Sequence, residues 1–245
     1  ALLARAHPVE FDEMINAWRL VVLGEGEVGL GLGLRHYGFP PEVLRRSDAH
    51  KSGALVVGYR LNSRETPFDY RLLAYEKGAY VLHMLRSMLL DPDTGDDQRF
   101  KAMMRRYATE HVGNVMSTQS FEATVTETFG EPMDWFFDQW VHHGGHTEYS
   151  VNWSWDEATK PVTVTCKQTQ KTDDLTSRFR MPVEIELASH SASQIRRVNV
   201  SKAEETFHFQ LDKKPTRVCF DPRDWVLKTL TVAKSREEWL DQLAY

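Results

Sequence analysis

The sequence predicts an α+β protein of more than one domain, mostly helical over residues 1–146 and followed by a small antiparallel β-sandwich over residues 147–232. One observation is that apolar residues recur every three or four positions up to Val141, as in amphipathic helices. The other is that apolar and polar residues alternate after Gly145, in short runs separated by polar turns. Residues 233–245 are expected to start a further helical segment.

Each element is predicted from its local pattern. Helical spacing covers residues 8–23, 75–89, 97–109, 117–129 and 132–141. Alternation predicts strands at residues 149–155, 162–166, 180–187, 194–200, 205–209 and 217–220. Residues 52–61 are predicted to form a short strand or another extended segment. Some acidic side chains are interpreted as solvated or helix-capping charges, namely Asp12, Glu13, Asp96, Asp97, Glu237 and Glu238.

Composition limits the classes of function. The chain has 245 residues, 41% hydrophobic and 27% charged, as in an ordinary globular protein. A formal net charge of −5 gives no support to a nucleic-acid partner, and no apolar run approaches the ~20 residues that span a bilayer. Cys166 and Cys219 could be free thiols or one disulfide. Because the chain begins at Ala1 without Met, we expect a piece of a longer protein, and the sequence specifies no oligomeric state or compartment.

The segment over residues 75–89 organises the helical part. One face of its predicted helix carries Tyr75, Ala79, Leu82, Leu85 and Leu89. This spacing predicts a core helix with Tyr75 on the apolar side. Gly78 lies in its first turns, where Gly costs about 1 kcal/mol relative to Ala. We therefore expect another backbone or a ligand to approach closely at Gly78.

This segment also resembles a known family. The run Tyr75-Glu76-Lys77-Gly78-Ala79-Tyr80-Val81-Leu82-His83-Met84-Leu85-Arg86 is similar to the tyrosine-bearing helix of the gluzincin zinc aminopeptidases related to aminopeptidase N and leukotriene hydrolase. Trp135-Phe136-Phe137-Asp138-Gln139-Trp140-Val141 resembles that family's closing catalytic helix, although His146-Thr147 replaces the usual Pro. Gly58-Tyr59-Arg60-Leu61, Phe220-Asp221-Pro222 and Trp225-Val226-Leu227-Lys228 resemble further family segments. The resemblance implies that residues 1–146 are the C-terminal part of a thermolysin-like catalytic domain.

The resemblance also implies a mechanism. In the family, a zinc-bound water attacks the peptide carbonyl, with a Glu as general base. A phenol then donates one hydrogen bond to the oxyanion without adding a charge. By resemblance this catalytic residue is Tyr75, and the parent enzyme takes zinc and a peptide substrate. The zinc motif H-E-x-x-H and the amine-binding G-x-M-E-N are both missing from residues 1–245. We therefore expect no zinc, no other cofactor and no hydrolysis from this chain alone.

Three alternatives stay open. The first is a non-catalytic scaffold or interaction module of the same fold, because some relatives lose the zinc residues. The second is another zinc site at His142, His143 and His146 with Glu148, although Gly144-Gly145 breaks the helix between these histidines, which favours solvated or structural roles.

The third alternative is a dinucleotide site. Gly24, Gly26 and Gly29 match G-x-G-x-x-G, with Asp48 about 20 residues further on. A helical pattern precedes this match, and no helix of useful length follows it. The strand-turn-helix context that holds a pyrophosphate is therefore missing, so a Gly-rich loop is favoured.

Overall fold

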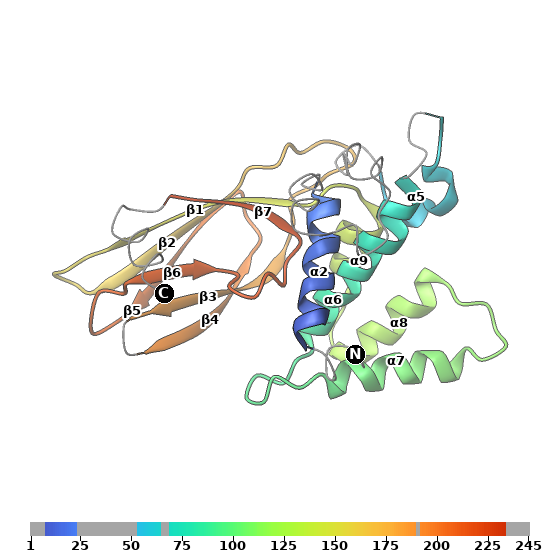
Figure 1. Cartoon of the computed structure of the whole chain (residues 1–245), viewed down its shortest axis with the longest axis horizontal. Helices are drawn as coiled ribbons and strands as arrows, with labels where there is room; N and C mark the ends of the chain where they lie inside the picture. Colours follow the sequence, from blue (N-terminus) through green and yellow to red (C-terminus); the bar gives the residue numbers. More distant parts are fainter. Residues whose placement is uncertain (1–7, 24–52, 65–68, 190–191, 234–245) are drawn as a thin grey trace. The chain divides into compact units, whose positions relative to one another are not determined.

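The chain forms two compact units in the computed structural model (Figure 1), which describes residues 8–23, 53–64, 69–189 and 192–233. The helical unit extends to Gly145 and includes Asp174–Ser177, whereas the sheet unit contains His146–Asp173 and the residues from Arg178 onward. The α+β prediction is confirmed. The Gly-rich loop, for which a dinucleotide site was the less favoured alternative, and the helix expected from Ser235 lie outside the described residues.

The helical unit contains helices of three kinds. Regular helices are α2 (Pro8–Val22), α5 (Asp69–Arg71), α6 (Gly78–Met88), α7 (Gln98–Glu110), α8 (Thr118–Phe129) and α9 (Asp134–Phe137). A 3₁₀ helix forms η2 (Leu55–Leu61), and π-helical turns form η3 (Leu72–Lys77) and η4 (Asp138–His142). In Figure 1, α2 lies alongside α6, and the two helices are in contact. Over the residues described here, no helix is both long enough and apolar enough to span a membrane.

The extended segment predicted over residues 52–61 is wrong. Leu55–Leu61 is instead a 3₁₀ helix with a kink at Gly58, whose φ is 60° and ψ is −135°. This conformation suits glycine and redirects the backbone, so the apolar run does not continue as a strand. The run Leu55-Val56-Val57 has the residue composition of a strand, but its backbone is not extended.

Both ends of α8 are capped. Ser117 accepts a hydrogen bond from the backbone N–H of Ser120, whose hydroxyl accepts from the Ser117 N–H. This capping box satisfies two N–H groups that the helix leaves without partners. Gly130 ends the helix in the left-handed conformation at φ 75°.

The sheet unit contains two sheets. One has the strand order β5-β2-β1-β7, from β1 (Thr147–Trp155), β2 (Pro161–Gln168), β5 (Glu204–Gln210) and β7 (Lys228–Val232). The other has the order β4-β3-β6, from β3 (Met181–Ala188), β4 (Ser193–Val200) and β6 (Arg217–Phe220). Tyr149 of the first sheet packs on Phe220 of the second, with ring centroids 5.2 Å apart. The inner faces therefore share an apolar core.

The prediction that all strands are antiparallel is wrong at one pair. β1 and β7 run parallel, from Thr147 opposite Lys228 to Val151 opposite Val232. Strand direction depends on how a connection returns to the sheet, and alternation along a strand contains no information about it. Cys166 and Cys219 are both free thiols.

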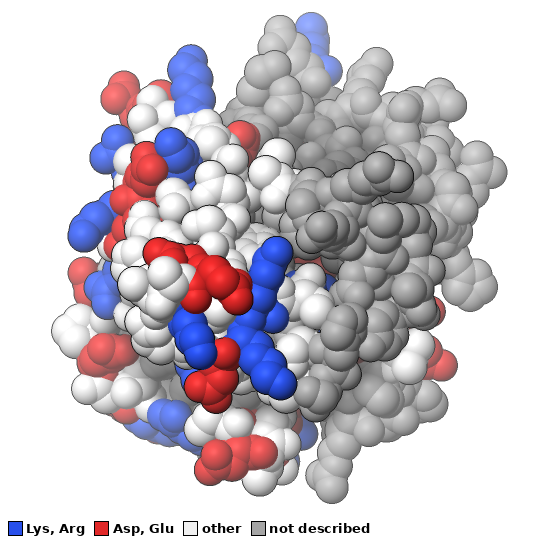
Figure 2. Space-filling view, turned by 90° about the vertical axis from the view of Figure 1, so that its left-hand side faces the viewer, with Lys and Arg blue, Asp and Glu red and all other residues white. Residues whose placement is uncertain are grey.

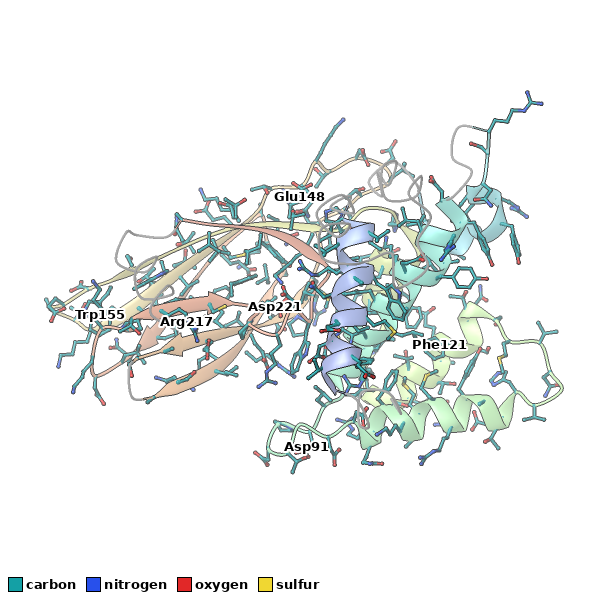
Figure 3. All side chains as sticks on the ribbon, viewed as in Figure 1. Asp91, Phe121, Glu148, Trp155, Arg217 and Asp221 are labelled. Carbon is teal, nitrogen blue, oxygen red and sulfur yellow. The ribbon has the colours of Figure 1, made fainter. Side chains whose placement is uncertain are left out.

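Side chains of both charges lie next to one another on the face of the molecule that Figure 2 presents. Two ion pairs of the sheet unit join Arg217 to Glu186 at 2.8 Å and Lys167 to Glu204 at 3.1 Å. Arg217 and Asp221, labelled in Figure 3, lie at the start of β6 and just after its end. Asp221 is buried and is bonded to Lys228.

Candidate active site

Tyr75 lies on a π-helical turn between two α-helical segments. Helix α5, turn η3 and helix α6 follow one another without a break from Asp69 to Met88. A π-turn contains more residues than an α-turn and is frequent at functional sites. This turn presents Tyr75 outward, so that 61% of the residue is exposed.

The prediction that Tyr75 lies on the buried face is therefore wrong. The buried positions of the turn are Leu72, Leu73, Glu76 and Lys77. The buried positions continue along α6 at Tyr80, Val81, Met84 and Leu85 with ordinary helical spacing, so the buried face is the one beside the face that the prediction chose. In chemical terms the exposed phenol can meet a ligand, which a core tyrosine could not.

Tyr75 belongs to a cluster of three tyrosines, which we call the tyrosine cluster: Tyr59, Tyr70 and Tyr75. The rings of Tyr59 and Tyr70 stack with centroids 4.0 Å apart, and Tyr70 meets Tyr75 edge to face at 5.8 Å. A hydrogen bond with Tyr59, with smaller effects of desolvation and of the other two phenols, raises the pKa of Tyr70 to about 12. Tyr70 is therefore neutral at physiological pH. The cluster provides an aromatic surface beside the Tyr75 hydroxyl.

A buried carboxyl group lies next to Tyr75 in sequence. Glu76 is 3% exposed, and its Oε1 is 3.5 Å from Nε of Arg71. Burial raises the pKa of Glu76, although its own backbone N–H and Arg71 oppose that shift. Its Oε2 has no hydrogen-bond partner in the described part of the chain. The carboxyl group is therefore held closer to its neutral form than a surface glutamate is.

A buried ammonium group ends the π-turn. Lys77 is 1% exposed, and its Nζ donates a hydrogen bond of 2.9 Å to the carbonyl oxygen of Gly145. Burial lowers the pKa of Lys77 to about 8. Gly145 has φ 79°, and a Cβ there would lie 2.7 Å from the Thr176 side chain. Position 145, whose carbonyl oxygen accepts the hydrogen bond from Lys77, therefore requires a glycine.

Gly78 is less crowded than the sequence suggested. A Cβ built on it would lie 3.5 Å from Leu55 Cδ1 and from the Leu73 carbonyl oxygen, which is ordinary contact. Its φ of −59° and ψ of −43° are regular α-helical values. The expected close approach of a backbone is therefore not observed among the described residues.

Gly78→Ala is expected to stabilise the helical unit by about 0.5–1 kcal/mol, because Ala has the higher helix propensity and fits the space. Urea unfolding of the chain measures this change. Gly130→Ala is the matched control and should destabilise by about 1 kcal/mol, since φ at Gly130 is 75°. A loss of stability in Gly78→Ala would show crowding that the geometry does not predict.

His83 is a buried histidine on α6. Its ring centroid lies 5.7 Å from that of Phe11 and 5.5 Å from that of Tyr80. Burial, assisted by the charge of Arg86, lowers the pKa of His83 to about 4. Its Nδ1 has no hydrogen-bond partner in the resolved ranges. His83 is therefore a neutral core residue at physiological pH.

We expect His83 to make the helical unit acid-sensitive. Its pKa is about 4 when folded and near 6.5 when unfolded. The unfolded state binds the proton first, so stability is complete above pH 6.5 and falls between pH 6.5 and 4. Over that window the loss is roughly 3 kcal/mol. Urea unfolding at several pH values should show a shallower slope for His83→Leu, whereas exposed His142→Gln should keep the parent slope.

The other predicted site residues lie in different surroundings. His142 is exposed, and His143 Nδ1 lies 2.9 Å from the Asp138 carbonyl oxygen. His146 is buried in the sheet unit, and Glu148 is half-buried on β1. Within the ranges that the structure describes, no group of three or more His, Cys, Asp or Glu residues could hold a metal.

Asp97, interpreted from the sequence as a solvated or helix-capping charge, is the N-cap residue of α7 without a side-chain capping bond, and it is not solvated. Asp97 is 6% exposed and pairs with Arg86 at 2.9 Å and with Lys101 at 2.5 Å. Burial alone would raise the pKa of Asp97, but hydrogen bonds from Lys101 and Arg86 hold it below its usual value. The carboxylate therefore links α6 to the start of α7.

Comparisons with known proteins support the resemblance seen in the sequence. No family model matches the chain. The chain is 25% identical over 189 residues to aminopeptidase N of Escherichia coli, covering 71% of this chain and 20% of that protein. It is 23% identical over 153 residues to aminopeptidase N of Haemophilus influenzae, covering 57% of this chain and 17% of that protein.

A solved structure shares the fold. Aminopeptidase A of Legionella pneumophila, in complex with aspartic acid, matches 91% of this chain with a TM-score of 0.57 and 16% identity. The match covers 25% of that structure's chain, and this chain spans at most a fifth of the length of the two aminopeptidases N. The predicted resemblance to the gluzincin aminopeptidases is confirmed.

Proposed function

We propose that this chain is part of a zinc-dependent aminopeptidase and supplies Tyr75 as the hydrogen-bond donor to the oxyanion of peptide hydrolysis. The observation that carries the proposal is the placement of Tyr75. It is exposed on a π-turn whose inward residues, Glu76 and Lys77, are buried polar groups. The motif around Tyr75 and the similarity to aminopeptidases support the same assignment.

The proposed chemistry uses the phenol as a neutral donor. When a peptide carbonyl becomes tetrahedral, its oxygen takes on negative charge, and a hydrogen bond to that oxygen is stronger than one to the ground-state carbonyl. Tyr75 can donate this bond through its hydroxyl group. The tyrosine cluster lies on the same surface, so Tyr70 and Tyr59 would contact a substrate bound at Tyr75.

The described residues do not fit a zinc site. They contain no suitable group of ligands, and H-E-x-x-H is absent from the sequence. The proposal assigns the zinc ligands and the general base to sequence outside residues 1–245, with Tyr75 facing them in the parent enzyme.

Two measurements on the chain test the proposal. Metal analysis of the purified chain should find no stoichiometric zinc, and an aminoacyl reporter substrate should show negligible turnover. Addition of the parent protein's preceding segment should restore both. If residues 1–245 alone bind one zinc ion and hydrolyse the reporter, the proposal that the zinc ligands lie outside these residues is wrong.

A second candidate is a non-catalytic scaffold of the same fold. The missing zinc motif favours it, because a relative that has lost the ligands would keep the architecture. The coding sequence before Ala1 distinguishes the candidates. An H-E-x-x-H motif there supports the enzyme, and a continuous catalytic-domain sequence without that motif supports the scaffold.

A further inference from the structure

We propose that Lys77 is a positioning residue for Tyr75: its buried ammonium group fastens the π-turn to the carbonyl of Gly145 and so fixes the direction of the Tyr75 phenol. The inference rests on the proposed function of Tyr75. It adds a residue that does not touch the substrate, and the observations that carry it are geometric.

The first observation is the burial of a charge that has no carboxylate partner among the residues that the structure describes. Lys77 is 1% exposed, and within those residues its Nζ donates one hydrogen bond, to a neutral carbonyl oxygen at 2.9 Å. A buried ammonium group without a counter-ion is unfavourable and is normally replaced by an apolar side chain. Lys77 therefore gives the fold no stability that a methionine could not give, which points to a different role.

The second observation is where the bond lies. Lys77 is the last residue of η3, two positions after Tyr75, so the bond holds the end of the turn that carries the phenol. Gly145 lies shortly after η4, the second π-turn of the helical unit. The hydrogen bond therefore joins segments 68 residues apart in sequence, each of which departs from α-helical geometry nearby.

The third observation is that the acceptor itself is fixed. The backbone N–H of Gly144 donates a hydrogen bond of 2.7 Å to the Leu175 carbonyl oxygen. A Cβ at Gly144 would lie 3.2 Å from the Gly53 carbonyl oxygen, so the two backbones are in close contact. With Thr176 against Gly145, the carbonyl is held from several sides. An anchored acceptor is what a positioning bond requires.

The test compares Lys77→Met with Lys77→Gln. Met keeps the apolar stem and removes the donor, whereas Gln keeps an N–H donor on a slightly shorter side chain. In the full-length enzyme, Lys77→Met should lower kcat about 10- to 100-fold with little change in KM, because a displaced catalytic group loses rate. Lys77→Gln should recover part of kcat. Lys101→Met, which removes a cation paired with Asp97, should leave kcat unchanged.

A second readout does not depend on activity. With 3-fluorotyrosine at position 75, the fluorine resonance should move or split in Lys77→Met and return toward the parent position in Lys77→Gln. If Lys77→Met does not fold, kcat and the fluorine resonance are compared between Lys77→Gln and the parent enzyme instead. An unchanged resonance together with an unchanged kcat overturns the role of Lys77. An inactive parent enzyme overturns the proposed function instead, and the resonance still tests Lys77.

Discussion

Tyr75→Phe is expected to lower kcat/KM of the enzyme that contains this chain by about 10²- to 10³-fold, the usual effect of removing one oxyanion donor. Because the bond forms only in the transition state, kcat should fall by the same factor and KM should change little. Stability should be nearly unchanged, since 61% of Tyr75 is exposed.

Steady-state kinetics on a peptide with a free amino terminus measures the effect. The control is Tyr107→Phe, which removes a hydroxyl near Ser117 and Ser120 in the same unit, away from the tyrosine cluster. Its kcat/KM should stay within about twofold of the parent. If Tyr75→Phe also stays within that range while the parent is active, Tyr75 is not the donor.

Most of the secondary structure could be predicted because it depends on local patterns. β6 was predicted at residues 217–220 and is observed at Arg217–Phe220. β1 alternates as predicted, with Tyr149 and Val151 buried. Such strands have one face in the core, so every second residue is apolar and the sequence alone indicates which side chains are buried.

The candidate site was predicted less completely. The motif pointed to Tyr75, but helical spacing placed it on the wrong face, because the face that is buried carries two polar residues, Glu76 and Lys77. Glu76 and Lys77 look like surface residues in the sequence and are buried in the structure. The partner of Lys77 is Gly145, and nothing in the sequence near Lys77 indicates a contact 68 positions away.

The sheet unit also contains a buried lysine, Lys228, which differs from Lys77 in forming an ion pair. Lys228 is 1% exposed, and its Nζ lies 2.7 Å from Asp221 Oδ2 and 2.7 Å from Asp224 Oδ1. Asp221 also accepts hydrogen bonds from the backbone N–H groups of Trp225 and Val226. The carboxylate therefore organises the connection between β6 and β7.

Lys228→Met is expected to destabilise the sheet unit by about 3–5 kcal/mol, because it leaves the Asp221 carboxylate buried without its cation. Urea unfolding followed by tryptophan fluorescence measures this loss. The double variant Lys228→Met with Asp221→Asn should be less destabilised than the sum of the two single variants, since the second change removes the unpaired charge. Asn tolerates the φ of 50° at residue 221. A loss below about 1 kcal/mol in Lys228→Met would mean that water reaches the carboxylate and replaces the cation.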